Sequence, residues 1–246
     1  MSNKRLGQHF LTNKQIVTDI LRAGEISKKD IILEVGPGKG VLTEALVQKA
    51  KKVIAVEKDK ELVEYLREKF SKYQNIEIIY GDILKISNLS FPTSKFKVVA
   101  NIPYYITSHF LRMFLSQTKF RPKLMVLMIQ KEVAERIVAK NGRESLLSLS
   151  IKAYGKPQII KIVRKGNFLP PPKVDSAVIK ISDISDNWFV QHRMSHKLFF
   201  EVLRKAFQQK RKMLRHSLGK NIPEKYANIR PEELKLEDWI TICLCR

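Results

Sequence analysis

Residues 31–40 read Ile-Ile-Leu-Glu-Val-Gly-Pro-Gly-Lys-Gly. The first half is a largely apolar run with the length and β-branched content of a buried strand. In the second half, glycines at positions 36, 38 and 40 permit positive φ angles and let the backbone approach a ligand closely. Apolar residues then recur at helical spacing at positions 42, 45 and 46. The stretch predicts a strand, a glycine loop and a helix, although a tight turn without a ligand would be consistent with the same residues.

The alternation of strand and helix continues along the chain. Further apolar runs predict strands, with helical patterns between most of them. We expect these strands at residues 53–56, 76–80, 96–100 and 124–129. This order predicts an α/β fold with a parallel, doubly wound sheet and right-handed crossovers. Two later runs, at residues 158–163 and 177–181, favour an antiparallel hairpin at the edge of the sheet.

The pattern changes after Ser182, where the sequence becomes polar and then helical. We place a domain boundary there, so that residues 1–182 form the sheet domain with an N-terminal lead-in and residues 183–246 form a small helical domain. The apolar spacing predicts one helix from Ser195 to Leu218. Pro231 is expected to begin the last helix, because proline is favoured in a first helical turn.

The charge of the chain indicates an anionic partner. Lysine and arginine number 46 against 24 acidic residues, a net charge of +22, and self-repulsion of this size favours binding to nucleic acid first and to an anionic membrane second. Residues 193–220 hold nine of the cations and one acid, Glu201. A solvated basic face is the alternative. The cations expected to contact RNA are Arg204, Lys205, Lys210, Arg211, Lys212 and Arg215.

Composition argues against several classes of protein. No run approaches the roughly 20 apolar residues of a membrane span, and the first ten residues lack the apolar core of a secretory signal. The two cysteines, Cys243 and Cys245, have no histidine cluster nearby, which argues against zinc. We expect a cytoplasmic protein with free thiols, no bound metal and no membrane association.

Polar residues follow the predicted strands at the points where they end. Glu57, Asp82 and Asn101 come directly after or at the end of three successive strands, and ligands of open parallel sheets bind at that edge. Glu57 can accept the hydroxyls of a ribose, and Asp82 can accept from an adenine amine. The glycine spacing is neither G-x-G-x-x-G nor G-K-[ST], which argues against a phosphate loop.

Residues 101–104 read Asn-Ile-Pro-Tyr. A side-chain amide, a Pro turn with free carbonyls and an aromatic ring at the end of a strand suit the binding of a planar base by its exocyclic amine. We expect Asn101 and the carbonyl of Ile102 or Pro103 to accept from that amine, and Tyr104 to stack on the ring. The alternative for Tyr104 is a structural ring that closes the turn, and Tyr105 is interpreted as packing.

Several of these motifs resemble those of known enzymes. Glu34-x-Gly36-x-Gly38-x-Gly40 resembles the S-adenosylmethionine (SAM) loop of class I, Rossmann-like methyltransferases. Five stretches in order resemble the rRNA adenine N6,N6-dimethyltransferases, most closely the type that modifies small-subunit (16S) rRNA. They are residues 7–11, 101–104, 130–136, 168–176 and 206–212. The related macrolide-resistance enzymes, which act on 23S rRNA, share the fold and the Asn-Ile-Pro-Tyr site.

The resemblance implies a function and a set of roles. It implies SAM-dependent dimethylation of two adjacent adenines near the 3′ end of 16S rRNA in the immature small subunit, by a monomer. Residues near the methionine part of SAM would be Gln8, His9, Leu11, Gly36 and Gly38. Glu57 would hold the ribose, Asp82 the adenine amine, and Asn101 would line both cofactor and target base. Phe168 would cover the face of that base opposite Tyr104, and a core position is the alternative for Phe168.

Three other functions remain open at this point. One is a 23S rRNA methyltransferase of the macrolide-resistance type. Another is a non-catalytic ribosome-assembly factor that uses the same fold as an RNA clamp. A third is a dinucleotide oxidoreductase, which would bind nicotinamide. A role for His9 as general base is disfavoured, because amine methylation does not require one.

Overall fold

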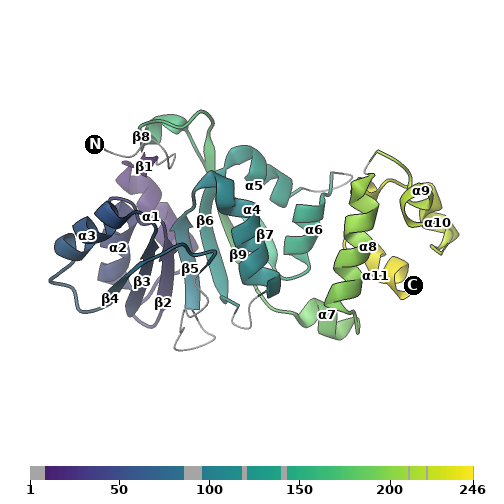
Figure 1. Cartoon of the computed structure of the whole chain (residues 1–246), viewed down its shortest axis with the longest axis horizontal. Coiled ribbons are helices and arrows are strands. Elements are labelled where there is room, and N and C mark those ends of the chain that lie inside the picture. Colours follow the sequence, from purple (N-terminus) through teal and green to yellow (C-terminus); the bar gives the residue numbers. More distant parts are fainter. Residues whose placement is uncertain are drawn as a thin grey trace. The chain divides into compact units, whose positions relative to one another are not determined.

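The computed structural model describes residues 9–85, 96–117, 121–139, 143–209, 211–219 and 221–245 (Figure 1). The chain forms two compact units, each made of two separate segments. The first comprises the chain up to Ala134 together with Gln158–Ser182, and the second comprises Glu135–Pro157 and the chain from Asp183 onward. The predicted domain boundary at Ser182 placed residues 135–157 with the sheet, whereas they belong to the second unit.

The first unit is built on a seven-stranded sheet with the order β4-β3-β2-β5-β6-β9-β7. Strands β2 to β6 pair in parallel, and β9 pairs antiparallel with β6. The strands are β2 (Ile31–Val35), β3 (Lys52–Glu57), β4 (Ile76–Tyr80), β5 (Phe96–Asn101), β6 (Leu124–Gln130), β7 (Lys156–Val163) and β9 (Ser176–Ser182). The predicted α/β sheet is confirmed. Of the two late strands, β9 is the inner one and β7 lies at the edge.

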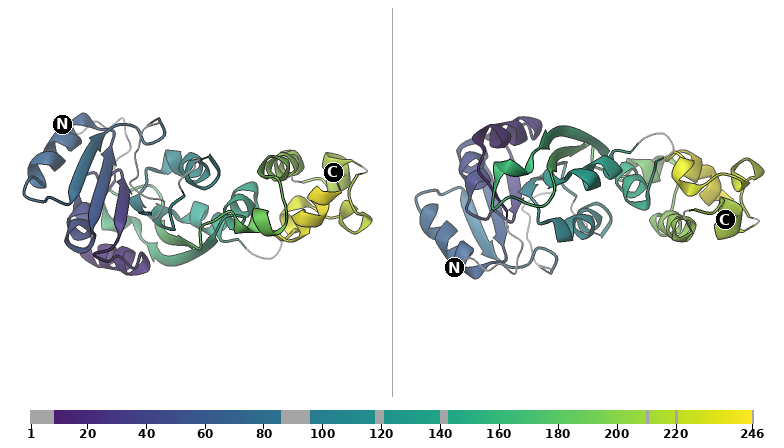
Figure 2. Two further views of the ribbon diagram at one scale, coloured as in Figure 1. Left: turned by 90° about the horizontal axis from the view of Figure 1, so that it is seen from below. Right: turned by 90° about the horizontal axis from the view of Figure 1, so that it is seen from above.

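Helices cover both faces of this sheet. They are α1 (Lys14–Ala23), α2 (Val41–Lys49), α3 (Lys60–Lys69) and α4 (Thr107–Arg112), and α5 (Lys131–Ile137) follows β6 and includes the boundary between the two units. Figure 2 shows α1, in purple, on the side of the sheet opposite to teal helices. Asp59 begins α3 by accepting from the N–H groups of Glu61 and Leu62, as expected for a helix N-cap.

A two-stranded ribbon joins distant parts of the first unit. Strand β1 (Phe10–Leu11) pairs antiparallel with β8 (Phe168–Leu169). The two strands lie side by side near the top of Figure 1. This pairing places the N-terminal segment beside the loop that contains Pro170, Pro171 and Pro172, called the triple-proline loop.

The second unit is helical. Its helices are α6 (Leu146–Lys152), α7 (Asn187–Gln191), α8 (His196–Gln208), α9 (Leu214–Leu218), α10 (Glu224–Ala227) and α11 (Asp238–Leu244). Large aromatic side chains fill its core, among them Phe189, Phe199 and Trp239. The Tyr154 hydroxyl lies 2.9 Å from Nδ1 of His196. This contact and the packing of α6 against α8 explain why residues 135–157 belong to this unit.

Two helix predictions for the C-terminal part are wrong. The single helix Ser195–Leu218 is interrupted: α8 ends at Gln208, Gln209 has φ −120° and ψ 50°, and α9 begins only at Leu214. The intervening run is basic, and like charges without acidic partners three or four residues away weaken a helix. Pro231–Glu233 forms a single 3-10 turn, because the backbone is extended at Leu234.

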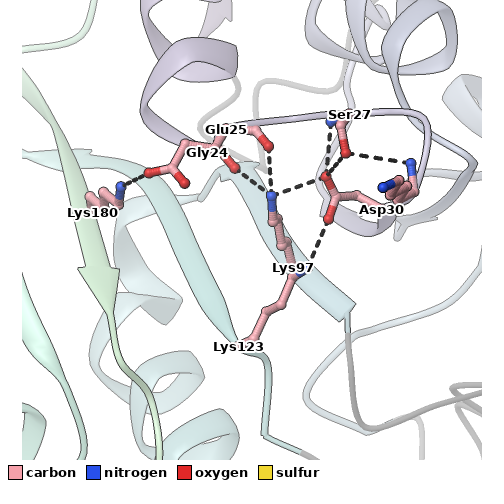
Figure 3. A network of polar contacts seen from close by, with 8 residues as sticks. Gly24, Glu25, Ser27, Asp30, Lys97, Lys123 and Lys180 are labelled. Atoms are coloured by element: carbon pink, nitrogen blue, oxygen red, sulfur yellow. Dashed lines mark hydrogen bonds and ion pairs between the residues drawn. The ribbon is translucent and has the colours of Figure 1, made fainter.

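A buried ionic network joins the amino ends of three central strands (Figure 3). Lys97 Nζ donates to the carbonyls of Gly24 at 2.8 Å and Glu25 at 2.7 Å, and to Asp30 Oδ2 at 3.0 Å. Lys123 contacts the other oxygen of Asp30 at 2.9 Å. Because Asp30 precedes β2, Lys123 precedes β6 and Lys97 lies in β5, the network fixes these strands to the end of α1.

Candidate active site at the carboxyl ends of the strands

A pocket lies at the carboxyl ends of the parallel strands. Residues of the glycine loop, the ends of β3, β4 and β5, and strand β1 line it. Glu57, Asp82 and Asn101, which the sequence predicted to meet at this edge, all contribute to the lining. The structure therefore brings together side chains that are up to 44 positions apart in the sequence, from Glu57 to Asn101.

The glycine loop forms one wall of the pocket with its backbone. Gly36, Gly38 and Gly40 have φ angles of 67°, 59° and 75°, which favour glycine. A Cβ atom on Gly38 would lie 3.0 Å from the ring of Phe10. The loop thus needs glycine both for its conformation and for the close approach of β1.

Glu57 is held in one orientation by backbone N–H groups. Its carboxylate accepts from Lys58 at 2.8 Å, Asp59 at 3.0 Å and Gly38 at 3.2 Å. The side chain is buried, which raises the pKa of Glu57 above its usual value, while the three N–H groups act in the opposite direction. A carboxylate has about four acceptor sites, so the fixed Glu57 can still accept hydroxyls from a ligand.

Asp82 is paired with a lysine at the mouth of the pocket. Lys58 Nζ lies 2.9 Å from Asp82 Oδ2, and the N–H of Leu84 donates to Oδ1 at 3.1 Å. Partial burial acts to raise the pKa of Asp82, but the hydrogen bonds and the charge of Lys58 outweigh it, and the pKa lies below its usual value. Asp82 is consequently an ionised acceptor at neutral pH.

Glu34 supplies a buried polar atom without a partner. Its side chain lines the pocket and is 1% exposed, and within the described part of the chain Oε2 has no hydrogen bond. Burial raises the pKa of Glu34 to about 8, with the Thr43 hydroxyl opposing this and Glu57 adding to it. Glu34 is thus largely protonated at neutral pH and can offer a hydrogen bond to a polar ligand.

Asn101 and Tyr104 lie together on the side of the pocket nearest β1. The Asn101 amide donates to the carbonyl of His9 at 3.4 Å, which leaves Oδ1 as an acceptor. The Tyr104 hydroxyl lies 2.7 Å from Ser176 Oγ, and burial raises the pKa of Tyr104. The ring centroids of His9 and Tyr104 are 6.3 Å apart, with 29° between the ring planes, so one face of the pocket is aromatic.

The sequence of the chain matches a known protein family. Residues 1–241 match the sequence model of a family described as ribosomal RNA adenine dimethylase. The chain belongs to this dimethylase family. The family prediction is confirmed, and membership makes the protein a SAM-dependent rRNA methyltransferase.

Individual relatives support the same assignment. The ribosomal RNA small subunit methyltransferase A of Dehalococcoides mccartyi is 42% identical over 258 aligned positions, which cover 99% of this chain and 88% of that protein. The crystal structure of a dimethyladenosine transferase from Plasmodium falciparum has a TM-score of 0.82 and 29% identity over 96% of both chains. The 23S rRNA methyltransferase ErmE, at 24% identity and a TM-score of 0.78 over 96% of this chain and 98% of its own, shares the fold.

Two of the three predicted N-terminal site residues lie at the pocket. His9 and Leu11 line the pocket, and His9 Nδ1 lies 2.8 Å from the carbonyl of Pro170. His9 is therefore tied to the triple-proline loop. Gln8, predicted to lie beside them, is outside the described residues.

The structure does not place Phe168 at the pocket. The residue is 4% exposed, packs in the hydrophobic core and is absent from the pocket lining. The cause is the β1–β8 ribbon: Phe168 pairs with Leu11, and both side chains belong to the core cluster.

Several residues that line the pocket were not predicted from the sequence, and Lys58, Ile83 and Tyr105 are among them. Lys58 and Ile83 directly follow Glu57 and Asp82, so their positions next to predicted ligand residues were a usable signal. The interpretation of Tyr105 as packing is wrong, since it is 67% exposed.

The predicted RNA-contacting cations of the second unit lie on its surface. Arg204 and Lys205 are exposed on α8, Arg211 and Lys212 are exposed in the following turn, and Arg215 is exposed on α9. Lys210 is outside the described residues. In the part of the chain that the structure describes, no helix has the length and hydropathy needed to span a membrane.

Proposed function

We propose that this dimethylase transfers methyl groups from SAM to N6 of two adjacent adenines near the 3′ end of 16S rRNA. The observation that carries this proposal is the position of Asn101 in the same pocket as Glu57 and Asp82, where an adenine amine and a methyl donor can meet. The choice of 16S rRNA is supported by the D. mccartyi relative, which is named for the small ribosomal subunit. The protein acts as a cytoplasmic monomer on the immature subunit.

The residues of the pocket fit SAM. The fixed carboxylate of Glu57 accepts the ribose hydroxyls, and the ionised Asp82 accepts the adenine amine. The backbone of Gly36 and Gly38 would approach the methionine end, which His9 and Leu11 would border. Bound SAM supplies a methyl group that is already activated on a sulfonium. The buried, unpartnered Oε2 of Glu34 supports a polar ligand at this position, because buried polar atoms are rarely left unpaired.

Asn101 and the adjacent backbone orient the acceptor. The N6 lone pair of adenine is delocalised into the ring, so the amine must be held in a more tetrahedral form. Asn101 Oδ1 accepts from N6–H, and the carbonyl of Ile102 or Pro103 is the second acceptor. The Pro103 carbonyl accepts one hydrogen bond, from Ile106 N–H at 3.1 Å, and has a second lone pair. Catalysis then depends on orientation and on preorganised dipoles, and the released proton passes to water.

The target adenine must leave its stack to reach the pocket. Tyr104 offers a half-buried ring fixed by Ser176, and base–aromatic stacking is worth about 1–3 kcal/mol. Phe168 forms the second wall only if it leaves the core. Tyr104 is thus the wall that the pocket already provides.

The second, helical unit binds rRNA phosphates. Its exposed cations Arg204, Lys205, Arg211, Lys212 and Arg215, with Lys210, attract phosphates whatever the RNA sequence. Such contacts release counterions, so RNA affinity falls steeply with salt concentration. Neutralising two of these cations together should reduce the salt dependence while SAM binding stays unchanged.

Transfer of labelled methyl groups to purified immature subunits tests the proposal. We expect label in 16S rRNA, with mass spectrometry locating it on two adjacent adenines, and a loss of at least about 100-fold in Asn101→Ala, the size seen when one preorganised dipole is removed. Glu57→Gln is the matched control, which should weaken SAM binding in calorimetry. Label only in 23S rRNA would overturn the choice of substrate. Assembly activity without any methyl transfer would favour the clamp, and binding of nicotinamide alone would favour an oxidoreductase.

A further inference from the structure

Tyr105 is an exposed aromatic residue at the rim of the pocket. It lines the pocket and is 67% exposed, whereas its neighbours Tyr104 and Ile106 are half-buried and buried. Among the described residues, no hydrogen bond or ring contact involves the Tyr105 side chain. An exposed aromatic side chain that forms no such contact is available to a ligand.

The backbone under Tyr105 is fixed. Tyr104–Ile106 forms a 3-10 turn, in which Ile106 N–H donates to the Pro103 carbonyl at 3.1 Å and Thr107 N–H donates to the Tyr104 carbonyl. Ile102 and Ile106 anchor the two ends in the core, at 1% and 8% exposure. A ring on a fixed turn loses little conformational freedom on binding.

Tyr104 and Tyr105 serve different faces of the site. A 3-10 helix turns by about 120° per residue, so consecutive side chains diverge. Tyr104 is held back by Ser176, and Tyr105 extends into solvent. The two rings therefore cannot enclose a single base, and each can stack on a base of its own.

A cation lines the same pocket as Tyr105. Lys58 belongs to the pocket lining, pairs with Asp82, and has a side chain that is 52% exposed. An exposed ring and an exposed cation in one pocket are the combination that binds single-stranded nucleic acid, through base stacking and phosphate attraction.

We propose that Tyr105 forms a second base subsite, which stacks on the unpaired nucleotide adjacent to the adenine held against Tyr104. Lys58 lies near the phosphates of that nucleotide. The inference rests on the proposed function in requiring an RNA substrate. It implies that the enzyme recognises two consecutive unstacked bases, and so discriminates against an isolated flipped adenine in a duplex.

Variants of Tyr105 test the subsite through methyl transfer. Tyr105→Ala should lower kcat/KM for immature small subunits by about 5- to 150-fold, the range that corresponds to one base–aromatic stack. Its Kd for SAM should be unchanged, and Tyr105→Phe should retain most of the activity. The matched control is Tyr65→Ala, since Tyr65 is 46% exposed on α3 and lies outside the pocket lining. Wild-type kcat/KM in Tyr105→Ala, or a weakened Kd for SAM, would overturn the proposal.

A binding measurement separates this inference from the proposed function. A short single-stranded RNA carries 2-aminopurine next to one adenine, and its fluorescence should be quenched by the wild-type protein but not by Tyr105→Ala. Replacing the 2-aminopurine nucleotide by an abasic one should weaken binding to the wild type and leave Tyr105→Ala unaffected. Equal losses in both proteins would refute stacking on Tyr105. If the wild type instead transfers no methyl group to any rRNA, the proposed function fails while this binding test still stands.

Discussion

Replacing Asp30 by asparagine should destabilise the first unit by about 3–5 kcal/mol at neutral pH, the usual cost of removing one partner of a buried ion pair. Asp30 is 3% exposed, and the Lys97 side chain is 7% exposed. Asparagine keeps the shape of the side chain and one acceptor oxygen but removes the negative charge, so the Lys97 ammonium has only neutral acceptors. The network in Figure 3 would then contain a buried charge without a counter-charge.

The lowered pKa of Asp30 gives an independent value for the stabilisation that its charge contributes. Burial acts to raise it, but hydrogen bonds from Lys123, Lys97 and Ser27 outweigh burial and lower the pKa to about 2 from the reference value of 3.8. This difference corresponds to about 2 kcal/mol. Because the folded-state pKa is lowered, the stabilisation is present above pH about 4 and is lost as the pH falls toward 2. The wild type and Asp30→Asn should therefore converge in acid.

The assay must report on the first unit. Both tryptophans of the chain, Trp188 and Trp239, lie in the second unit, so their fluorescence serves as an internal control. Hydrogen exchange of the β2 and β5 amides in increasing urea gives the stability of the sheet. Lys123→Met is the matched variant: the Lys123 side chain is 48% exposed, and its loss should cost at most about 1 kcal/mol. Equal effects of the two substitutions would refute the reasoning.

Three further predictions concern the pocket. The pKa of Glu34 is raised to about 8 from 4.5, so the stabilisation from its protonated form is present below pH about 4.5 and is lost as the pH rises through 8. Melting temperatures should therefore show the wild type losing stability relative to Glu34→Gln over that range. Tyr104→Phe leaves the hydroxyl of Ser176, which is 0% exposed, without its partner and should lower the free energy of unfolding in urea by about 1–2 kcal/mol. Its kcat/KM should fall less than that of Tyr104→Ala, and an equal fall in the two variants would contradict a stacking role. Gly38→Ala combines a φ of 59° with a Cβ contact of 3.0 Å to the Phe10 ring and should weaken SAM binding more than tenfold in calorimetry, so an unchanged Kd would contradict the close approach of β1.

Much of the sheet could be predicted because its signal is local. Strands β2, β3, β5 and β6 are nearly continuous buried apolar runs, as strands covered on both faces must be, whereas β4 at the edge of the sheet is only partly buried. The carboxyl ends of the parallel strands bring Glu57, Asp82 and Asn101 together by topology alone. The two-residue strands β1 and β8 are too short for a periodic pattern. Their pairing, which joins Phe10 to Leu169 and Leu11 to Phe168 across more than 150 positions of sequence, places Phe168 in the core.

The remaining site residues depend on local geometry that composition does not encode. The outward direction of Tyr105 follows from the 3-10 turn after Pro103, and two consecutive tyrosines in a sequence do not indicate which is buried. The Lys58–Asp82 pair joins the ends of neighbouring strands. In the second unit, the apolar residues of 195–218 keep helical spacing throughout, so this spacing does not show the interruption between α8 and α9. The interruption coincides with a cluster of basic residues.

The division of the second unit into two segments has a consequence for synthesis on the ribosome. Residues 135–157 emerge before the chain from Asp183 onward, with which they share a compact unit. Leu149, Ile151 and Tyr154, which are at most 2% exposed in the finished fold, must wait without their helical partners while β7 and β9 are made. The sheet can be completed at Ser182, so the nascent chain can acquire its cofactor pocket while an apolar segment of the other unit is still uncovered.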